Sequence, residues 1–447
     1  MRIRSLAIVL FLAGLVVPRL ATAAFPGPLK VSPNGRYFVD RDGKPFFWLG
    51  DTAWPLFTLY SQSQAENYLS NRAAKGFTVV QAALAWPVGS DNPPEAIPPL
   101  LNVPVPNISG EPIWINNNPA TPNDAFFKHV DDLVAFADRQ GLVVAILPVQ
   151  GQFVNQTKTL TAQNARVFGR WVGNRYKNAP NIVWVNGGDR TPVGFGDVYL
   201  ELGRGLREGD GGAHLMTYHI CGWHSSSQFF HRADWLDFNL IQTWTDWPEV
   251  YPAVSADLAM TPPKPVVLGE GAYEDGPEYP LGPITPLIVR RQAWWATLAG
   301  GFFSYGQNQM WRMAKGWEKA FDTPGAGQVC LMKKIFAACP WWDMIPDQGL
   351  FESGVSSEQT LNAAMRSSDG ETALVYLSGK CRVFLHLDKI LTKNVKVTLV
   401  NPATGERKEG GTYATGNLTD DTFPPAQIHD FVTPGFWEDA VLILEGF

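Results

Sequence analysis

Eight apolar runs recur between residues 45 and 306, and segments of helical length separate them. Each run is nearly continuous in apolar residues, which is typical of parallel strands that are covered on both faces. Eight such strands alternating with helices predict a (β/α)8 TIM barrel, an α/β fold. The predicted strands cover residues 45–50, 77–85, 142–150, 181–187, 215–220, 236–243, 264–270 and 300–306.

The segments between these runs have the apolar spacing of amphipathic helices. In 125–141, Phe126, Val130 and Leu133 recur at helical intervals, and Gly141 ends the segment before the next apolar run. Further helices are predicted at 63–76, 162–178 and 287–300. A doubly wound open sheet is the alternative, but no glycine-rich phosphate loop follows the first predicted strand, which favours the barrel.

The pattern changes after about residue 345, where short apolar runs are separated by turn residues. Such runs at 372–378, 382–388, 395–402 and 439–446 indicate a small all-β sandwich. We therefore predict a catalytic barrel over 24–344 and an accessory β-sandwich domain over 345–447. The proline-rich segment 93–122 is predicted to be a long loop above the barrel mouth.

The first 23 residues have a basic start, an apolar stretch and the small-residue ending Ala21-Thr22-Ala23, which predicts a secretory signal peptide. We expect the protein to be secreted or periplasmic. No later apolar run is long enough to span a membrane. Removal of residues 1–23 changes the formal charge from −6 to −9, and this acidic balance without basic runs argues against nucleic-acid partners.

Four cysteines are present, and nine positions separate Cys330 from Cys339. A disulfide between these two is one possibility that the spacing alone does not establish. His219 and His224 lack an acidic third ligand at a convincing spacing, so neither a metal site nor another cofactor is predicted. The oligomeric state is not determined by the sequence.

Catalytic groups of a TIM barrel lie just beyond the C-terminal ends of its strands. At and near the predicted strand ends the side chains are carboxylates, amides, a histidine and aromatic rings, as in sites that bind sugars. They are Asp51, Trp86, Gln150, Asp189, His219, Gln242, Trp244, Glu270, Tyr305, Gln307 and Asn308. Trp244, Trp247 and Trp311 are either sugar-stacking platforms or core residues; the 17 tryptophans of the chain fit either use.

Two carboxylates stand out, Asp189 after the fourth predicted strand and Glu270 at the end of the seventh. These strand ends lie across a barrel mouth from each other, so the two acids can flank one glycosidic bond. Asp189 could instead form a structural ion pair with Arg190. Asp51 could bind substrate hydroxyls or only backbone at the barrel rim, and Glu274 is a supporting or alternative acid.

The stretches GRYFVDRDGKPFFWLGDTAWPLF, NIVWVNGGD and PVVLGEGAYE resemble those of the apiosidase-like glycoside hydrolases of family 140. VTLVNPATGE and WEDAVLILE resemble the small β-domain attached to these enzymes, a type labelled as collagen-binding. Together these motifs extend the resemblance over essentially the whole chain after the signal peptide.

The resemblance implies a retaining glycoside hydrolase in which Asp189, from the GGD motif, is the acid/base and Glu270 is the nucleophile. It also implies a polysaccharide substrate, with release of apiose from pectic rhamnogalacturonan side chains as the best-known activity. A non-catalytic carbohydrate- or matrix-binding protein and a metal-dependent hydrolase are the alternative functions.

Overall fold

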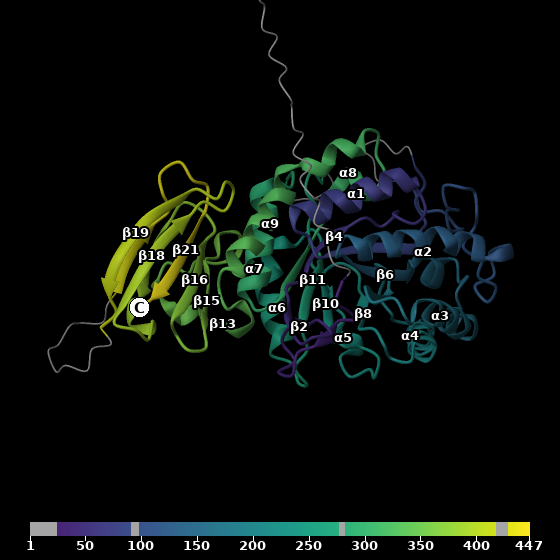
Figure 1. The fold of residues 1–447 in the computed structure, drawn as a ribbon, viewed down its shortest axis with the longest axis horizontal. Helices are drawn as coiled ribbons and strands as arrows, with labels where there is room; N and C mark the ends of the chain where they lie inside the picture. The colour runs from purple at the N-terminus through teal and green to yellow at the C-terminus, as the bar shows by residue number, and fades with distance from the viewer. Residues whose placement is uncertain (1–24, 91–97, 277–281, 417–427) are drawn as a thin grey trace, which may run out of the picture.

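The computed structural model describes residues 25–90, 98–276, 282–416 and 428–447. An α/β body and a smaller β body pack side by side in Figure 1, with the chain running from purple and teal in the first to yellow in the second. The predicted signal peptide, residues 1–23, lies outside the described residues.

Within the described residues, eight parallel strands surround the core of the α/β body. They are β4 (Leu49–Thr52), β5 (Val79–Ala85), β6 (Val143–Val149), β7 (Ile182–Gly187), β8 (Met216–His219), β10 (Asn239–Gln242), β11 (Val266–Glu270) and β12 (Phe302–Tyr305). Their order is β8-β7-β6-β5-β4-β12-β11-β10, and the short strand β9 (His224–Ser225) pairs antiparallel with β10. The Asp237 N–H donates to the Met216 carbonyl at 2.8 Å, which closes the ring between β8 and β10. The predicted TIM barrel is confirmed.

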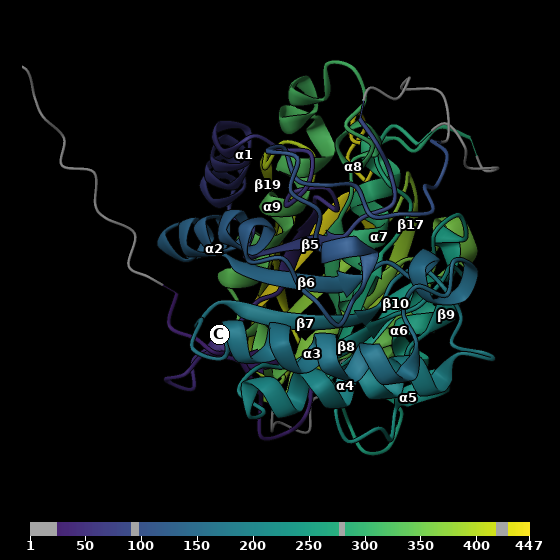
Figure 2. The same ribbon diagram turned by 90° about the vertical axis from the view of Figure 1, so that its right-hand side faces the viewer.

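Helices cover the outside of the barrel, as Figure 2 shows for the helices that flank β5, β6 and β7. They are α1 (Gln62–Lys75), α2 (Asp124–Arg139), α3 (Ala162–Tyr176), α4 (Gly196–Asp210), α5 (Ser227–Phe230), α6 (Val250–Leu258), α7 (Pro286–Leu298), α8 (Asn308–Trp311) and α9 (Pro324–Ala337). Local sequence sets their ends: Ser61 and Gln64 form a capping box before α1, and Gly76 stops it at φ 107°. In the described ranges, no helix is long and apolar enough to cross a membrane.

A small antiparallel sheet closes the N-terminal end of the barrel. It consists of β1 (Lys30–Val31), β2 (Phe38–Val39) and β3 (Pro45–Phe46). The Phe38 ring packs against Trp48, Phe238 and Phe302 at centroid distances of 5.1–5.5 Å. The predicted first strand, 45–50, is therefore divided. Pro45–Phe46 belongs to this sheet, and the barrel strand begins at Leu49.

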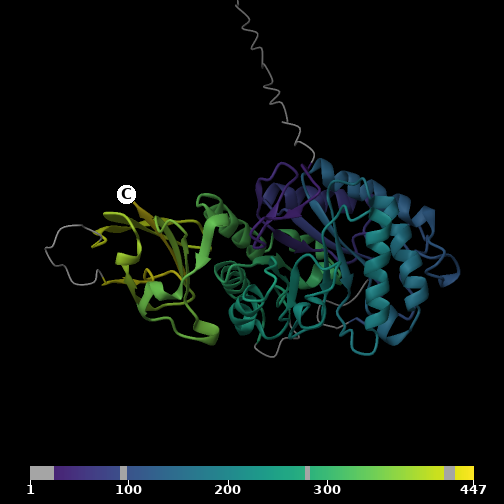
Figure 3. The same cartoon turned by 90° about the horizontal axis from the view of Figure 1, so that it is seen from below.

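Over its described residues, the C-terminal body consists of a six-stranded and a three-stranded antiparallel sheet. Figure 3 shows this body, in green and yellow, beside the barrel. The first has the order β13 (Met344–Pro346), β15 (Ala363–Ser367), β16 (Thr372–Leu377), β21 (Ala440–Gly446), β18 (Asn394–Val400) and β19 (Arg407–Ala414). The second has the order β14 (Phe351–Ser353), β17 (Arg382–His386) and β20 (Ile428–Val432). One apolar cluster, including Val375 and Leu385, lies between the sheets, so the predicted small β-sandwich is confirmed.

Helix α7 joins the two bodies. Its Trp294 stacks on Tyr376 of β16 with ring centroids 5.4 Å apart and planes 15° apart. Its Arg290 pairs with Asp439 at 2.7 Å, and both of these side chains are buried. Because the contact combines apolar stacking with a buried ion pair, the β-domain is held in a fixed orientation on the barrel.

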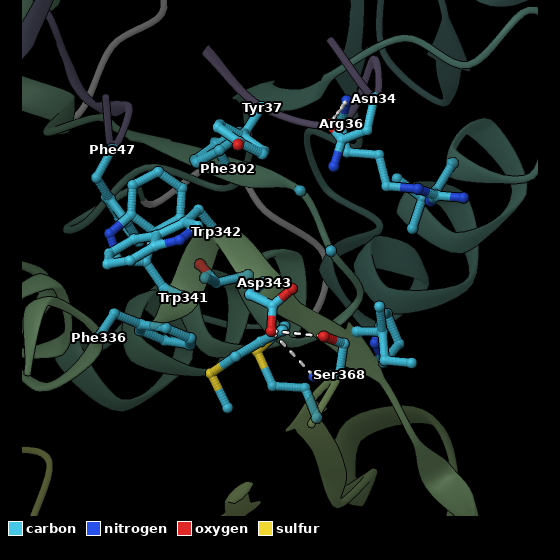
Figure 4. Close-up of a pocket in the computed structure, with 18 residues that line it drawn as sticks. Asn34, Arg36, Tyr37, Phe47, Phe302, Phe336, Trp341, Trp342, Asp343 and Ser368 are labelled. Atoms are coloured by element: carbon cyan, nitrogen blue, oxygen red, sulfur yellow. Dashed lines mark hydrogen bonds between the residues drawn. The ribbon is translucent and has the colours of Figure 1, made fainter. Parts of the chain in front are cut away.

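A cavity of about 180 Å³ lies where the N-terminal segment, β12 and the start of the β-domain meet (Figure 4). Aromatic rings that include Phe47 and Trp341 line one side of it, and Trp342 is 44% exposed. The Asp343 carboxylate accepts hydrogen bonds from the backbone N–H and hydroxyl of Ser368. These bonds connect the end of the barrel domain to the β-domain.

Asp51 lies inside β4 and points outward, away from the barrel mouth. Its Oδ2 accepts a hydrogen bond from the Tyr68 hydroxyl at 2.6 Å and pairs with Nε of Arg72, and the Asp51 and Arg72 side chains are fully buried. Nη1 of Arg72 also donates to the Phe321 carbonyl at 2.8 Å. The expectation that Asp51 binds substrate is therefore corrected, since this carboxylate links β4 to α1 and to the segment before α9.

The four cysteines are all free thiols. Cys330 lies inside α9, which continues to Ala337, and Cys339 follows two residues later. A helix rises about 1.5 Å per residue, so this geometry separates the two by more than the about 7 Å that a disulfide spans. The Cys330–Cys339 bond that the spacing had allowed is absent.

Replacing Arg72 by methionine should destabilise the fold, because the Asp51 carboxylate would stay buried without its cation. We expect Arg72→Met to lower the free energy of unfolding by about 3–5 kcal/mol, measured by denaturant unfolding followed by circular dichroism. The double variant Asp51→Leu/Arg72→Met removes both charges and should recover most of this loss. Equal stability of Arg72→Met and the unmodified protein would contradict this role.

Candidate active site

A cavity of about 550 Å³ opens at the C-terminal ends of the barrel strands. Its lining combines two carboxylates with amides, histidines and a group of large aromatic rings. The lining residues are Trp54, Trp86, Pro87, Val88, Pro98, Leu100, Leu147, Gln150, Gly188, Asp189, Arg190, Thr191, His219, Cys221, Gly222, Trp223, His224, Gln242, Trp244, Glu270, Tyr273 and Trp311. Pro98 and Leu100 come from the described part of the predicted loop 93–122.

A left-handed turn at the end of β7 places the first carboxylate in this cavity. Gly187, Gly188 and Asp189 have φ values of 92°, 126° and 51°. The Gly188 N–H donates to the His219 carbonyl at 3.0 Å, and the Gly151 N–H donates to the Gly188 carbonyl at 2.8 Å. A Cβ on Gly188 would lie 2.6 Å from the Gly151 nitrogen. Only glycine fits there, because the chain is fixed between its neighbours at a positive φ.

Asp189 is held by three polar neighbours. Its Oδ1 accepts a hydrogen bond from Gln242 Nε2 at 3.2 Å, and its Oδ2 lies 3.1 Å from Nη1 of Arg190. Its backbone N–H donates to Nδ1 of His219 at 3.2 Å. The ion pair with Arg190 considered from the sequence is thus present. The Asp189 side chain nevertheless keeps 40% of its surface exposed, and it lines the cavity.

Glu270, the last residue of β11, supplies the second carboxylate. Its side chain is 13% exposed, and its Oε2 lies 3.1 Å from Nε2 of His219. Because Nδ1 of His219 accepts from the Asp189 backbone, neutral His219 carries its proton on Nε2, the nitrogen that faces Glu270. His219 therefore connects the two acids.

Strand β10 positions a further part of the site next to Glu270. Its register against β11 shifts between Ile241 and Gln242, and the Thr243 N–H donates to the Glu270 carbonyl at 3.0 Å. Trp244 follows with φ 47°, a left-handed conformation that is strained for an aromatic residue. Strained residues of this kind cluster at functional sites, and here the strain turns Trp244 into the cavity lining.

The pKa of Asp189 is raised to about 6. Burial among the cavity walls is the largest cause, and repulsion by the Glu270 carboxylate is the second. The Arg190 cation, the neighbouring His219 and the hydrogen bond from Gln242 oppose this rise. An acid whose pKa is near 6 can both give and take a proton close to neutral pH.

Aromatic rings form the walls on the side of β4, β5 and α8. Trp54 lies 5.1 Å from His219 in an edge-on arrangement, and its Nε1 donates to the Tyr273 hydroxyl at 3.2 Å. Trp86 lies 6.4 Å from Trp54 with planes 22° apart, and Trp311 meets Trp86 edge-on at 6.4 Å. Flat rings around a carboxylate pair suit the apolar faces of a sugar.

The structure brings most of the residues predicted for the site into one cavity. Those that line it are Trp86, Gln150, Asp189, His219, Gln242, Trp244, Glu270 and Trp311. Asp51, Glu274, Tyr305 and Asn308 are buried outside this lining. Trp247, considered as a stacking platform, packs in the core on Trp295 with planes 11° apart.

Glu274 and Tyr305 belong to a structural network behind the cavity. Tyr305 pairs with Asp51 between β12 and β4, and its hydroxyl donates to the Glu274 carboxylate. Glu274 also accepts from the Gly325 N–H at 3.0 Å, in the first turn of α9. A carboxylate at a helix N-terminus satisfies unpaired N–H groups there. Glu274 is therefore not the supporting or alternative acid of the site, and Tyr305 is not part of the sugar-binding lining, which corrects both expectations.

Asn308 acts on the cavity through Trp311. Its Oδ1 accepts hydrogen bonds from Trp311 Nε1 at 3.2 Å and from Arg312 Nη2 at 2.7 Å, while its Nδ2 donates to the Asp275 carbonyl at 3.1 Å. Its side chain is buried and lies outside the cavity lining. The structure therefore places Asn308 as a support for the Trp311 ring.

Sequence reasoning missed Trp54, Tyr273 and Trp223, which all line the cavity. Trp54 follows β4 by two residues, so the correct limits of the first strand would have identified it. Tyr273 is adjacent to Glu274 in a segment where only the acid was considered. For Trp223, which precedes β9 with φ 66°, the sequence carries no recognisable signal. In the part of the chain that the structure describes, no group of three potential ligands could hold a metal ion.

Two solved structures share this architecture. A crystal structure described as a glycoside hydrolase family 5 protein from Bacteroides vulgatus ATCC 8482 is 25% identical, with 95% of each chain covered and a TM-score of 0.83. A second, described as a glycoside hydrolase, is 24% identical, covers 95% of this chain and 98% of its own, and has a TM-score of 0.82. No curated protein sequence matches the chain.

Two family models match the sequence in succession. The model described as “Putative collagen-binding domain of a collagenase” matches residues 345–445. The model described as “Apiosidase-like, catalytic domain” matches residues 32–343, which include both acids and the whole cavity lining. The chain therefore belongs to the apiosidase-like family and is a glycoside hydrolase.

Proposed function

We propose that the protein is a retaining glycosidase in which Asp189 is the acid/base and Glu270 is the nucleophile. The observation that carries this proposal is the convergence of the two carboxylates on one cavity from the ends of β7 and β11, with His219 in contact with both. Glycoside hydrolysis requires two such carboxylates, one to protonate the leaving oxygen and one to react at the anomeric carbon.

In the first step, Asp189 donates its proton to the glycosidic oxygen while an oxygen of Glu270 attacks the anomeric carbon. The bond from this carbon to the glycosidic oxygen breaks, an ester to Glu270 forms, and the leaving alcohol departs. The pKa of about 6 keeps a useful fraction of Asp189 protonated near neutral pH. Nε2 of His219 lies 3.1 Å from Oε2 of Glu270, so the imidazole stands beside the attacking carboxylate.

In the second step, Asp189 removes a proton from water, and this water attacks the anomeric carbon of the ester. The carbon–Glu270 bond breaks, which releases the sugar and restores both acids. The Glu270 charge, which raises the pKa of Asp189, is absent in the ester, so this pKa falls in the intermediate. Asp189 is thereby converted from an acid into a base.

The proposed substrate is a side chain of a plant cell-wall polysaccharide of the rhamnogalacturonan type, from which the enzyme releases apiose. The apiosidase-like family match and the aromatic lining support a sugar substrate of this kind. The predicted signal peptide supports action outside the cytoplasm, where such polymers are found. A screen of pectic oligosaccharides, with identification of the released sugar by chromatography and mass spectrometry, tests this proposal.

Removing either carboxylate should abolish turnover while leaving the fold intact. We expect Asp189→Asn and Glu270→Gln each to lower kcat/KM by at least about 10²–10⁴-fold, measured on a cleaved pectic oligosaccharide or on 4-nitrophenyl apiosides. Asparagine suits the left-handed backbone at position 189, so the loss would not reflect strain.

Glu274→Gln is the matched control, because this acid lies four residues from Glu270 but outside the cavity. It should leave kcat/KM within a few-fold of the unmodified enzyme, although it weakens the cap of α9. Full activity of Asp189→Asn or Glu270→Gln, or loss of activity only in Glu274→Gln, would contradict the assignment.

The pH dependence of kcat/KM should report the proton on Asp189. Because the acid must be protonated, we expect the rate to fall as pH rises through about 6, the pKa of Asp189. The Arg190 cation lowers this pKa, so Arg190→Met should move the falling limb to higher pH, whereas Arg190→Lys should move it less. A falling limb that stays in place in Arg190→Met would show that another group titrates.

A further inference from the structure

A second cavity, of about 510 Å³, lies beside the catalytic cavity. Residues of β9, β10 and α6 line it, and Figure 2 shows these three elements near one another at one side of the barrel. Trp223, His224 and Gln242 line both cavities, so the two spaces meet at these residues. The two-step mechanism uses only the first cavity.

Two buried oxygen atoms at this second cavity lack hydrogen-bond partners among the described residues. They are Oγ1 of Thr243, which is 3% exposed, and Oε1 of Gln242, which is 2% exposed. Both residues line the cavity. Buried polar atoms are nearly always satisfied, because leaving one unpaired costs free energy. Thr243 Oγ1 is closed to solvent as its side chain stands, and rotation about χ1 would turn it toward a donor in this cavity, whereas the Gln242 amide is held toward Asp189.

The charge of the lining restricts this ligand. Asp246, Glu249 and Asp257 contribute carboxylates, and the described lining contains no lysine or arginine. The Asp257 oxygens accept from the hydroxyls of Ser225 and Ser227, so this group already has partners within the fold. Carboxylates accept hydrogen bonds from hydroxyl groups but repel an anionic ligand. The lining therefore disfavours an anionic ligand and can accept hydrogen bonds from a hydroxyl-rich one.

Trp223 provides an apolar face at the junction of the two cavities. Its side chain is 58% exposed, and its ring meets that of Trp244 at 5.2 Å with planes 66° apart. Both residues have a positive φ, 66° for Trp223 and 47° for Trp244. An exposed aromatic ring beside unpaired buried oxygens matches a sugar, which has an apolar face and hydroxyl groups at its edges.

We propose that the second cavity is a subsite for one uncharged sugar unit of the substrate. The sugar ring lies on Trp223, and its hydroxyls donate to the Asp246 carboxylate and, after rotation about χ1, to Thr243 Oγ1. This inference rests on the proposed glycosidase function and narrows it: the substrate carries a neutral sugar, not a uronic acid, in the unit that enters this cavity.

Binding without turnover tests the subsite. Methyl α-L-rhamnopyranoside, a neutral deoxysugar, and methyl α-D-galactopyranosiduronate, an anionic sugar, are titrated into the Glu270→Gln protein while tryptophan fluorescence is recorded. We expect saturable binding of the neutral glycoside and at least about 10-fold weaker binding of the uronate, because like charges repel. In the Glu270→Gln protein, the double change Asp246→Asn/Glu249→Gln should reduce the preference for the neutral glycoside over the uronate.

Three further variants of the Glu270→Gln protein test the geometry. Thr243→Val, which lines only the second cavity, keeps the side-chain shape but removes the unpaired hydroxyl. It should weaken neutral-sugar binding several-fold without lowering Tm, whereas a purely structural hydroxyl would lower Tm when lost. Trp223→Gly suits the left-handed backbone and should abolish binding. Trp223→Phe should keep part of the affinity.

Trp342→Ala is the matched control, because Trp342 is an exposed tryptophan at the other end of the barrel (Figure 4). With Trp342→Ala added to the Glu270→Gln protein, the binding curves should equal those of Glu270→Gln alone. Equal affinity for both sugars, or unchanged binding in Thr243→Val and Trp223→Gly, would overturn the subsite. If the unmodified enzyme hydrolyses its substrate but the Glu270→Gln protein does not bind the neutral glycoside, only the subsite is overturned. If the neutral glycoside binds but the unmodified enzyme hydrolyses no substrate, the subsite is supported and the proposed function is overturned.

Discussion

The left-handed turn at the end of β7 is the constraint on which the rest of the site depends. An ordinary strand end would carry the chain straight on toward α4, and its side chains would continue to alternate between core and outside. Gly187 and Gly188 instead bend the backbone at positive φ between the ends of β6 and β8. Because neither position has room for a side chain, the turn has one arrangement, and this arrangement places Asp189 in the cavity.

His219 connects the turn that carries Asp189 to the second acid, Glu270. The backbone of Asp189 fixes Nδ1 of His219 as an acceptor, which directs Nε2–H toward Glu270. Gln242 holds Asp189 from β10, and the residue after Gln242 bonds to the backbone of Glu270. The two carboxylates are therefore positioned by the strand ends that carry them and by the buried side chains of His219 and Gln242. Such preorganisation is what lowers the cost of reaching a transition state.

The sequence was informative where apolar runs are long. It predicted the barrel, the β-sandwich and the strand ends that carry Asp189 and Glu270, because parallel buried strands leave a clear pattern. It was wrong near β4, where two short strands are nearly continuous in sequence. Ending this strand at residue 50 instead of Thr52, two residues too early, placed Asp51 at the barrel mouth and hid Trp54. The outward direction of Asp51, Glu274 and Tyr305 depends on tertiary packing with α1 and α9, which no local pattern encodes. The positive φ values of Trp223 and Trp244 likewise become visible only in the structure.

In the proposed mechanism, Glu270 forms a covalent bond to the sugar. A 2-deoxy-2-fluoro glycosyl fluoride of the released sugar, or its cyclic epoxide analogue, should accumulate this intermediate, and intact-mass and peptide mass spectrometry would locate it. We expect one adduct per chain, on the peptide that contains Glu270, and no adduct in Glu270→Gln. An adduct on a different residue, or turnover with inverted anomeric configuration and no adduct, would contradict it.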